Sequence, residues 1–191
     1  MRIINLTAGD TAAVRQAAEL LVLGFREHWP DAWPDLEAAL AEVHELLSAG
    51  AILRAAVDTD GTLLGWIGGS SQYDGNAWEL HPLVVHPASQ RQGIGSALVA
   101  DLSARVAERG GHTLWLGSDD VDALTSVSGI DLYPNPLEHL AAIRNLRGHP
   151  YEFYQKQGFA LVGILPDANG PGKPDILMAK RVSVAPGDRP R

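Results

Sequence analysis

The 191-residue chain contains no cysteine. It therefore forms no disulfide, uses no thiolate nucleophile and builds no cysteine-ligated zinc site. Long hydrophobic runs are missing as well, since no window approaches the ~18–20 uninterrupted apolar residues of a membrane-spanning helix. Residues 1–25 lack the basic and then apolar pattern of a signal peptide. We therefore expect a cytoplasmic protein that works without a membrane partner.

Positive charge is also scarce: 15 Lys and Arg stand against 23 Asp and Glu, a formal net charge of −8. Nucleic-acid backbones attract positively charged surfaces, so we expect no nucleic-acid partner. The negative net charge either keeps the protein soluble or attracts a polycationic ligand. Composition alone does not decide between these two interpretations. With 46% hydrophobic and 20% charged residues, the chain is expected to fold around a sizeable core.

Hydrophobic periodicity and turn signals predict strands and helices in the order β-αα-βββ-α-β-αα-ββ, a mixed sheet flanked by helices. Pro82 falls inside a predicted strand, which indicates a bulge or a sheet edge. The predicted helices are 11–25, 36–47, 93–109, 137–146 and 150–157. The predicted strands are 1–6, 51–57, 63–69, 77–85, 113–117, 159–165 and 174–182, with loops over 70–76 and most of 118–148.

The stretch Leu83–Ala100 reads as a strand, a glycine-bearing turn and a helix. Its turn, Gln90-Arg91-Gln92-Gly93-Ile94-Gly95, would expose consecutive backbone N–H groups at a helix N-terminus, which suits a phosphate. The glycines let the backbone approach a ligand closely. No Lys-Ser/Thr follows, and the spacing is not Gly-x-Gly-x-x-Gly, so both common nucleotide motifs are excluded. Taken alone, the turn also fits a plain helix start.

Longer blocks around this turn resemble the GCN5-related N-acetyltransferase (GNAT) superfamily, and within it the aminoglycoside 6′-N-acetyltransferases. The turn itself is common to the superfamily, whereas the blocks are specific. The resemblance extends from about Trp29 to Val182. The blocks are 78–85 (WELHPLVV), 116–122 (LGSDDVD), 145–159 (NLRGHPYEFYQKQGF), 165–170 (LPDANG) and 173–176 (KPDI).

The resemblance implies an α/β (α+β) single-domain GNAT fold over residues 1–182. Its mixed, mostly antiparallel sheet is flanked by helices, and its fourth and fifth strands are splayed. Residues 183–191 are polar and proline-containing and are expected to form a flexible C-terminal tail. The resemblance also implies a homodimer.

The resemblance further implies acetyl-CoA as the cosubstrate. The backbone N–H of Leu83 would face the thioester oxygen, Val85 would continue along the pantetheine arm, and Arg91 with the N–H groups of 92–96 would hold the pyrophosphate. The implied cofactor-binding residues are Leu83, Val84, Val85, Arg91, Gln92, Gly93, Ile94, Gly95, Ser96 and Tyr154.

Four residues are candidates for catalysis: Glu79, His81, Leu83 and Tyr154. Glu79 and His81 are two apart on a strand and share a face, where a carboxylate can orient an ammonium group and accept its proton, directly or through water. His81 either positions the acceptor or satisfies a neighbouring hydrogen bond. Tyr154 occupies the family's Tyr-x-Lys-x-Gly-Phe pattern, which implies that it protonates the coenzyme thiolate. A packing role remains open for it, with Tyr151 as the fallback acid.

The acceptor side is expected to be acidic and aromatic. Asp119, Asp120 and Asp122 follow a strand end, where ligands of open sheets bind. They do not complete a calcium loop, so we predict no metal and favour substrate ammonium groups. Trp29 and Trp33 either pack under a loop or, like Tyr73, stack on sugar rings. The predicted substrate-binding residues are Trp29, Tyr73, Glu79, Asp119, Asp122, Glu138 and Glu152.

The leading hypothesis is an acetyl-CoA-dependent aminoglycoside 6′-N-acetyltransferase that transfers acetyl directly, as in antibiotic resistance. One alternative keeps the GNAT chemistry with a polyamine, peptide or other amine as acceptor. A second alternative is a non-catalytic module that binds acetyl-CoA or a cationic ligand. The presence of both Glu79 and Tyr154 favours an enzyme over that module.

Overall fold

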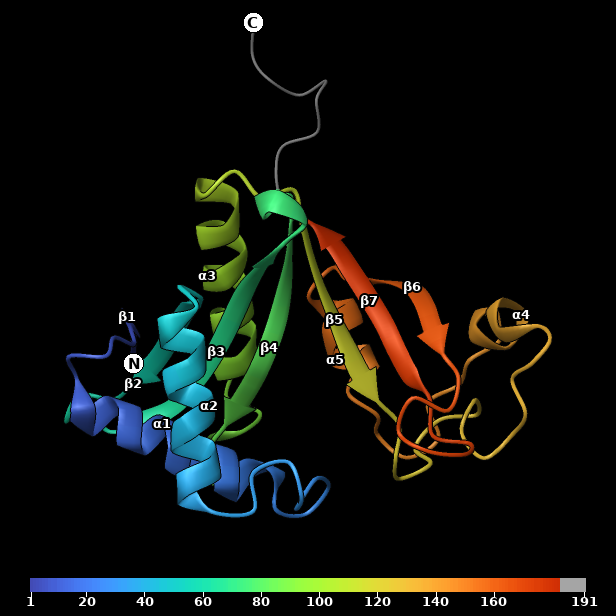
Figure 1. The fold of residues 1–191 in the computed structure, drawn as a ribbon, viewed down its shortest axis with the longest axis horizontal. Helices are drawn as coiled ribbons and strands as arrows, with labels where there is room; N and C mark the ends of the chain where they lie inside the picture. The colour runs from blue at the N-terminus through green and yellow to red at the C-terminus, as the bar shows by residue number, and fades with distance from the viewer. Residues whose placement is uncertain (183–191) are drawn as a thin grey trace, which may run out of the picture. The chain divides into compact units, whose positions relative to one another are not determined.

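The computed structural model describes residues 1–182 (Figure 1). The predicted tail, 183–191, lies outside the described residues. Contacts divide the described chain into two compact units, which we treat separately. The first unit comprises Met1–Leu114 with Val182, and the second unit comprises Trp115–Arg181. Within residues 1–182, no helix combines the length and apolarity that a membrane crossing requires.

The first unit is built on four strands in the order β1-β2-β3-β4, and each neighbouring pair is antiparallel. Aspartates begin its first two helices, because Asp10 accepts from the N–H of Ala13 and Asp35 from that of Ala38, which satisfies orphan donors. Its strands are β1 (Arg2–Asn5), β2 (Ile52–Val57), β3 (Leu63–Gln72) and β4 (Ala77–Val85). Its helices are α1 (Thr11–Phe25), α2 (Leu36–Ser48), α3 (Ile94–Glu108) and the short η1 (Tyr73–Gly75) and η2 (Pro87–Ser89).

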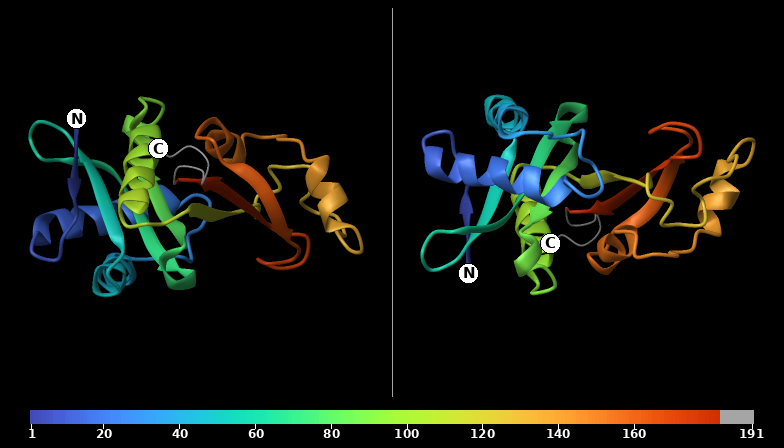
Figure 2. Two further views of the ribbon diagram at one scale, coloured as in Figure 1. Left: turned by 90° about the horizontal axis from the view of Figure 1, so that it is seen from above. Right: turned by 90° about the horizontal axis from the view of Figure 1, so that it is seen from below.

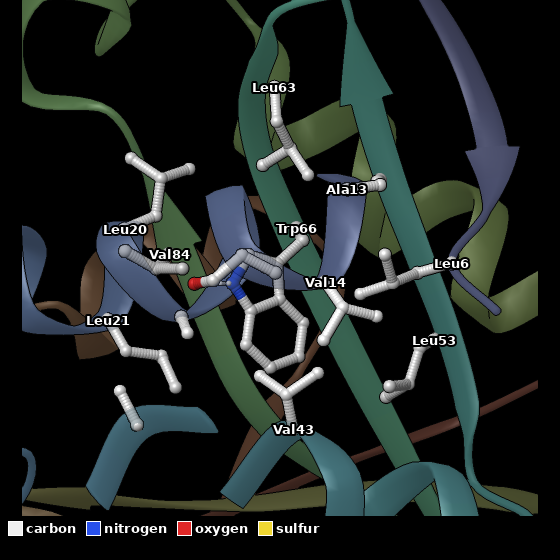
Figure 3. Packing of buried hydrophobic residues seen from close by; sticks show 14 of the residues in the cluster. Leu6, Ala13, Val14, Leu20, Leu21, Val43, Leu53, Leu63, Trp66 and Val84 are labelled. Atoms are coloured by element: carbon white, nitrogen blue, oxygen red, sulfur yellow. Dashed lines mark hydrogen bonds between the residues drawn. The ribbon is translucent and has the colours of Figure 1, made fainter. Parts of the chain in front are cut away.

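Helices cover both faces of these strands (Figure 2). On the α1–α2 face, Trp66 is fully buried, and its indole N–H donates to the carbonyl of Ala17 in α1 at 3.0 Å. Figure 3 shows Trp66 surrounded by aliphatic side chains such as Val14 and Val43. On the opposite face, a Cβ on Gly69 would lie 2.7 Å from Leu102 of α3. The glycine therefore lets α3 pack directly onto β3.

A buried ion pair ties α3 to the strands. Arg54 of β2 is 8% exposed, and its guanidinium donates to both carboxylate oxygens of Asp101 at 2.5 and 3.1 Å. A third bond joins Arg54 to the side chain of Asn5. Removing one partner would leave an uncompensated buried charge, so this bidentate pair fixes the position of α3.

The β3–β4 hairpin is longer than the sequence predicts. Residues 70–72, expected to form a loop, continue β3, because Ser70, Ser71 and Gln72 pair with Glu79, Trp78 and Ala77. The turn is thereby shortened to η1 and Asn76, and Tyr73 and Asp74 adopt positive φ of 49° and 55°. This conformation is uncommon for non-glycine residues, especially for a bulky tyrosine.

The second unit places β7 between β5 and β6, with β6 and β7 antiparallel. The predicted helix 137–146 ends at Ala141, because Leu146 N–H instead bonds to Leu124 O and Ser126 N–H to Arg144 O. Tertiary pairing thus overrides local helix preference. The elements are β5 (Thr113–Asp119, from Trp115 onward in this unit), α4 (Pro136–Ala141), α5 (Tyr151–Lys156), β6 (Ala160–Leu165) and β7 (Asp175–Arg181).

Candidate functional site

Strand β4 contains the bulge that Pro82 predicts. Leu83 pairs with Ile67 and Leu80 pairs with Gly69, so that His81 and Pro82 together lie opposite the single residue Gly68. A Cβ on Gly68 would collide with the carbonyl oxygen of His81, which explains the glycine. The prediction of a bulge at this proline is confirmed.

Upstream of the bulge, Glu79 and His81 share the face that α2 covers. Glu79 is half-buried, and the amide of Gln72 lies 3.5 Å from its Oε2. The His81 Nε2 atom lies 3.8 Å from Oε1 of Glu42 in α2. Nothing in the spacing of α2 singles Glu42 out, so sequence reasoning missed this neighbour.

The predicted aromatic residues of the first unit lie in different settings. Trp33 is 9% exposed, packs edge-on against Phe25 at 4.7 Å and has its ring centre 6.0 Å from that of His81. It is thus a core residue that also borders His81. Trp29 is half-buried in the turn after α1, where its N–H donates to the Phe25 carbonyl at 2.7 Å, whereas Tyr73 is 78% exposed at the β3–β4 turn.

Downstream of the bulge, two backbone N–H groups point away from β3. The His86 N–H donates to Leu64 O at 2.8 Å, and antiparallel ladders alternate, so the Val84 N–H also points to β3. The N–H groups of Leu83 and Val85 therefore point to the other edge of β4. These two are the groups predicted to serve the thioester and pantetheine, whereas the Val84 side chain packs against Gly24 in the core.

The glycine turn presents a row of unsatisfied donors. Arg91 and Gly93 adopt positive φ of 60° and 84°, and Gly93 begins α3 without a side-chain cap. The Ala97 N–H is the first of the helix to find an acceptor, the Gly93 carbonyl at 3.0 Å. Within residues 1–182, none of the six backbone N–H groups of 91–96 has a protein acceptor. This arrangement fits a pyrophosphate.

In the second unit, the three neighbouring aspartates have different roles. Asp120 is fully buried and accepts from the N–H groups of Leu124 and Thr125 and from the Thr125 hydroxyl at 2.6–2.9 Å. The Asp120 carboxylate therefore holds the loop after β5 in its conformation. Asp119 is exposed, and its Oδ1 accepts from the Asn169 amide at 2.5 Å. Asp122 is exposed, and Arg147 donates to its backbone carbonyl at 3.0 Å.

His149 links the end of β5 to the start of α5. It is 2% exposed, and its Nδ1 accepts from the Tyr151 N–H at 3.1 Å. Its Nε2 therefore carries the proton and donates to the Asp119 carbonyl at 3.1 Å. Burial lowers the pKa of His149, although the Asp119 carbonyl and the nearby Asp120 and Asp119 charges oppose that shift.

Tyr154 lies on α5 between two aromatic rings, with Phe153 at 5.1 Å and Phe159 at 5.7 Å. It is half-buried, and burial raises the pKa of its hydroxyl well above the ordinary value. The phenol is thus protonated at neutral pH and available as a proton donor. Tyr151, the fallback acid, is 5% exposed, and burial also raises its pKa. Glu138 and Glu152 are exposed on α4 and α5.

Known proteins resemble this chain over nearly its full length. Residues 14–133 match the acetyltransferase (GNAT) family model. A solved aminoglycoside 6′-N-acetyltransferase complexed with coenzyme A is 42% identical, with a TM-score of 0.88 over 97% of this chain and 99% of that one. The solved aminoglycoside 6′-N-acetyltransferase from Enterococcus faecium is 43% identical to this chain, with a TM-score of 0.87 over 97% of this chain and 99% of that one. A solved aminoglycoside 6′-acetyltransferase type Ii is 37% identical, with a TM-score of 0.73 over 97% of this chain and 100% of that one.

Among curated protein sequences, none matches the chain significantly. The structural matches nevertheless cover both units and confirm the predicted α/β fold class. The splay of the fourth and fifth strands and the single-domain boundary stay predictions. By its family model and these relatives, the chain belongs to the GNAT acetyltransferase family.

Proposed function

We propose that the protein is an acetyl-CoA-dependent aminoglycoside 6′-N-acetyltransferase that confers antibiotic resistance. The observation that carries this proposal is 42% identity over 97% of the chain to an aminoglycoside 6′-N-acetyltransferase. Transfer is direct, from the thioester to the amine. The chain has no cysteine to form a thioester of its own, which agrees with direct transfer.

The glycine turn holds the pyrophosphate of acetyl-CoA in this proposal. The six unsatisfied N–H groups of 91–96 and the positive end of the α3 dipole favour its negative charge. The N–H groups of Leu83 and Val85 serve the thioester and pantetheine end. A donor aimed at the thioester oxygen stabilises the negative charge that develops there during attack.

Glu79 acts on the acceptor amine. Its half-buried carboxylate, held near Gln72, binds the ammonium group and orients it for attack. Glu79 accepts one proton of the ammonium group, directly or through water, and the neutral amine attacks the thioester carbon. The nitrogen then loses a second proton to water as the amide forms and the carbon–sulfur bond breaks. Tyr154 donates a proton to the departing thiolate, because its phenol is protonated at neutral pH. Burial raises the pKa of this phenol, so Tyr154 gives up its proton only to a base as strong as the departing thiolate becomes in a shielded site.

The remaining amines of the acceptor bind to acidic side chains. Aminoglycosides carry several ammonium groups, and the chain has a formal net charge of −8. Asp119, Asp122, Glu138 and Glu152 are exposed and able to contribute, while Tyr73 is free to stack on a sugar ring. We further propose that the enzyme acts on cytoplasmic acetyl-CoA as a homodimer, which light scattering of the purified protein tests.

The test is thiol release. Purified protein is incubated with acetyl-CoA and kanamycin, free coenzyme A is measured with a thiol reagent, and the acetylated position is read by NMR. Incubation without acceptor controls for hydrolysis. Release that depends on kanamycin, with acetylation at the 6′-amine, is expected. Faster turnover of spermidine or a peptide would favour another amine acceptor. Binding of acetyl-CoA without thiol release on any amine would favour the non-catalytic module.

A further inference from the structure

His149 is a buried titratable residue of the second unit that the proposed mechanism does not use. The residue is 2% exposed, and its imidazole lies between the end of β5 and the first residue of α5. Asn145 holds its backbone twice, accepting from the His149 N–H at 2.8 Å and donating to the His149 carbonyl at 2.9 Å. The ring is therefore fixed between two elements that carry proposed site residues, Asp119 on β5 and Tyr154 on α5.

The imidazole uses both of its ring nitrogens. Nε2 donates to the carbonyl oxygen of Asp119 at 3.1 Å, and Nδ1 accepts from the backbone N–H of Tyr151 at 3.1 Å. Only the neutral imidazole can do both, because it holds one donor and one acceptor at fixed positions of a rigid ring. An imidazolium would direct a second N–H at the N–H of Tyr151. The neutral ring therefore joins the end of β5 to the start of α5.

Helix α5 depends on such contacts for its position. It has six residues, too few to be stable alone. Its N-cap residue is Pro150, which offers no side-chain acceptor, so Nδ1 of His149 supplies the acceptor that a capping side chain would. Tyr154 follows Tyr151 by about one turn and lies on nearly the same face of the helix. A shift of the first turn is therefore passed on to the phenol of Tyr154.

The other end of α5 is held by a different strand. Lys180 of β7 donates from Nζ to the Gln157 carbonyl at 3.0 Å, and this Nζ lies 5.4 Å from the ring centre of Phe159. Because this end is anchored, loss of the His149 contact should tilt α5 rather than unfold it. A small displacement of a catalytic group lowers the rate strongly even where the site still binds its substrate.

We propose that His149 is a positioning residue that sets α5, and with it Tyr154, relative to the end of β5. The inference rests on the proposed function and deepens it, because Tyr154 protonates the thiolate and Asp119 is one of the carboxylates that bind the acceptor. The Asp119 carboxylate is itself held by the amide of Asn169 at 2.5 Å. His149 is buried, contacts neither acceptor nor coenzyme, and transfers no proton.

Two substitutions separate the two bonds of the imidazole. A glutamine N–H reaches the place of Nε2 and an asparagine oxygen that of Nδ1, so His149→Gln keeps the bond to Asp119 and His149→Asn keeps the bond to Tyr151. For His149→Gln, kcat with kanamycin should fall about tenfold while KM for kanamycin stays within about twofold. For His149→Asn, which loosens Asp119, kcat should stay within about twofold and KM should rise about threefold. His139→Gln, at a half-buried histidine of α4, is the matched control and should behave as wild type.

A double-mutant cycle with Tyr154→Phe separates positioning from folding. In the Tyr154→Phe background, His149→Gln should cost less than about twofold in kcat, because the hydroxyl that His149 positions is gone. Equal losses of kcat in both Tyr154 backgrounds overturn the assignment. A parallel fall of kcat in His149→Gln and His149→Asn also overturns it, because that result indicates a general loss of structure.

The wild-type protein supplies a test that needs no folded variant. At neutral pH, heteronuclear NMR of the histidine rings should show His149 as the neutral Nε2–H tautomer. The Nδ1–H tautomer, or an imidazolium, overturns the assignment. Wild-type turnover of kanamycin with a His149→Gln variant that keeps full kcat overturns the assignment and leaves the proposed function standing. A wild-type protein that releases no thiol with kanamycin overturns both.

Discussion

The first unit carries its candidate groups on a strand and at a helix start, whereas the second unit carries them on loops and short helices. In the first unit, the backbone of Leu83 and Val85 and the turn 91–96 are fixed by the β3–β4 register and by α3. In the second unit, Asp119 accepts hydrogen bonds from the side chains of His149 and Asn169, and Tyr154 packs between the rings of Phe153 and Phe159.

The two units are therefore vulnerable to different kinds of substitution. A regular scaffold with a buried apolar core loses stability when volume is removed, because its neighbours relax only in part. A loop scaffold loses stability when one polar anchor is removed, because several donors lose their acceptor together.

Trp66→Ala should cost the most, because the indole is fully buried between α1 and the strands. We expect a loss of about 4 kcal/mol in the free energy of unfolding, the usual range for a large aromatic truncated in a core. Chemical denaturation monitored by circular dichroism measures it. Tyr73→Ala removes a side chain that is 78% exposed and should cost under about 1 kcal/mol. Equal costs at the two sites would refute the core assignment.

Tyr154→Phe should leave the fold intact and slow the chemistry. Loss of a general acid commonly lowers turnover by about 100-fold, so we expect kcat to fall that far while the Kd for acetyl-CoA changes less. Steady-state kinetics and calorimetric titration give the two numbers. Tyr133→Phe, at an exposed tyrosine of the same unit, should behave as wild type. An unchanged kcat in Tyr154→Phe would reduce Tyr154 to a packing residue.

Asp120→Asn should destabilise the second unit by about 2 kcal/mol, since a buried carboxylate with three donors becomes an amide that presents its own N–H groups to them. Asp131→Asn is the matched control, because Asp131 is exposed and accepts one N–H, from Tyr133. Denaturation midpoints compare the two variants. A smaller loss at Asp120 than at Asp131 would contradict the anchor role.

These sites also show what the sequence could reveal. The bulge at Pro82 and the glycine turn are predictable because proline and glycine restrict or free the backbone locally. The element order is predictable because each periodic stretch buries one face. Asp120 looks like its neighbours in the sequence, and its burial depends on how the chain folds back at Thr125. The place of Glu42 beside His81 depends on how α2 lies over β4, which no local pattern encodes.

His149 makes a pH-dependent contribution to stability. Burial lowers its pKa below the ordinary 6.5, so between the two values the unfolded chain is protonated and the folded chain is not. The contribution is therefore complete above pH 6.5 and is lost as pH falls toward the lower folded value. Unfolding free energies from pH 5 to 8 should show the difference between wild type and His149→Gln shrinking toward acid. A constant difference would mean that the pKa of His149 is the same in the folded and the unfolded chain.

Asp122→Asn should have the smallest effect, because an exposed charge pair contributes little to binding in water. We expect the Kd for kanamycin to rise roughly threefold at low salt and to approach the wild-type value at high salt, since mobile ions screen the attraction. Calorimetric titration at two ionic strengths measures both. Salt dependence separates this exposed aspartate from the buried Asp120 of the same unit, because Asp120 acts through short hydrogen bonds that salt does not screen. An equal Kd at low salt would mean that Asp122 makes no contact with the acceptor.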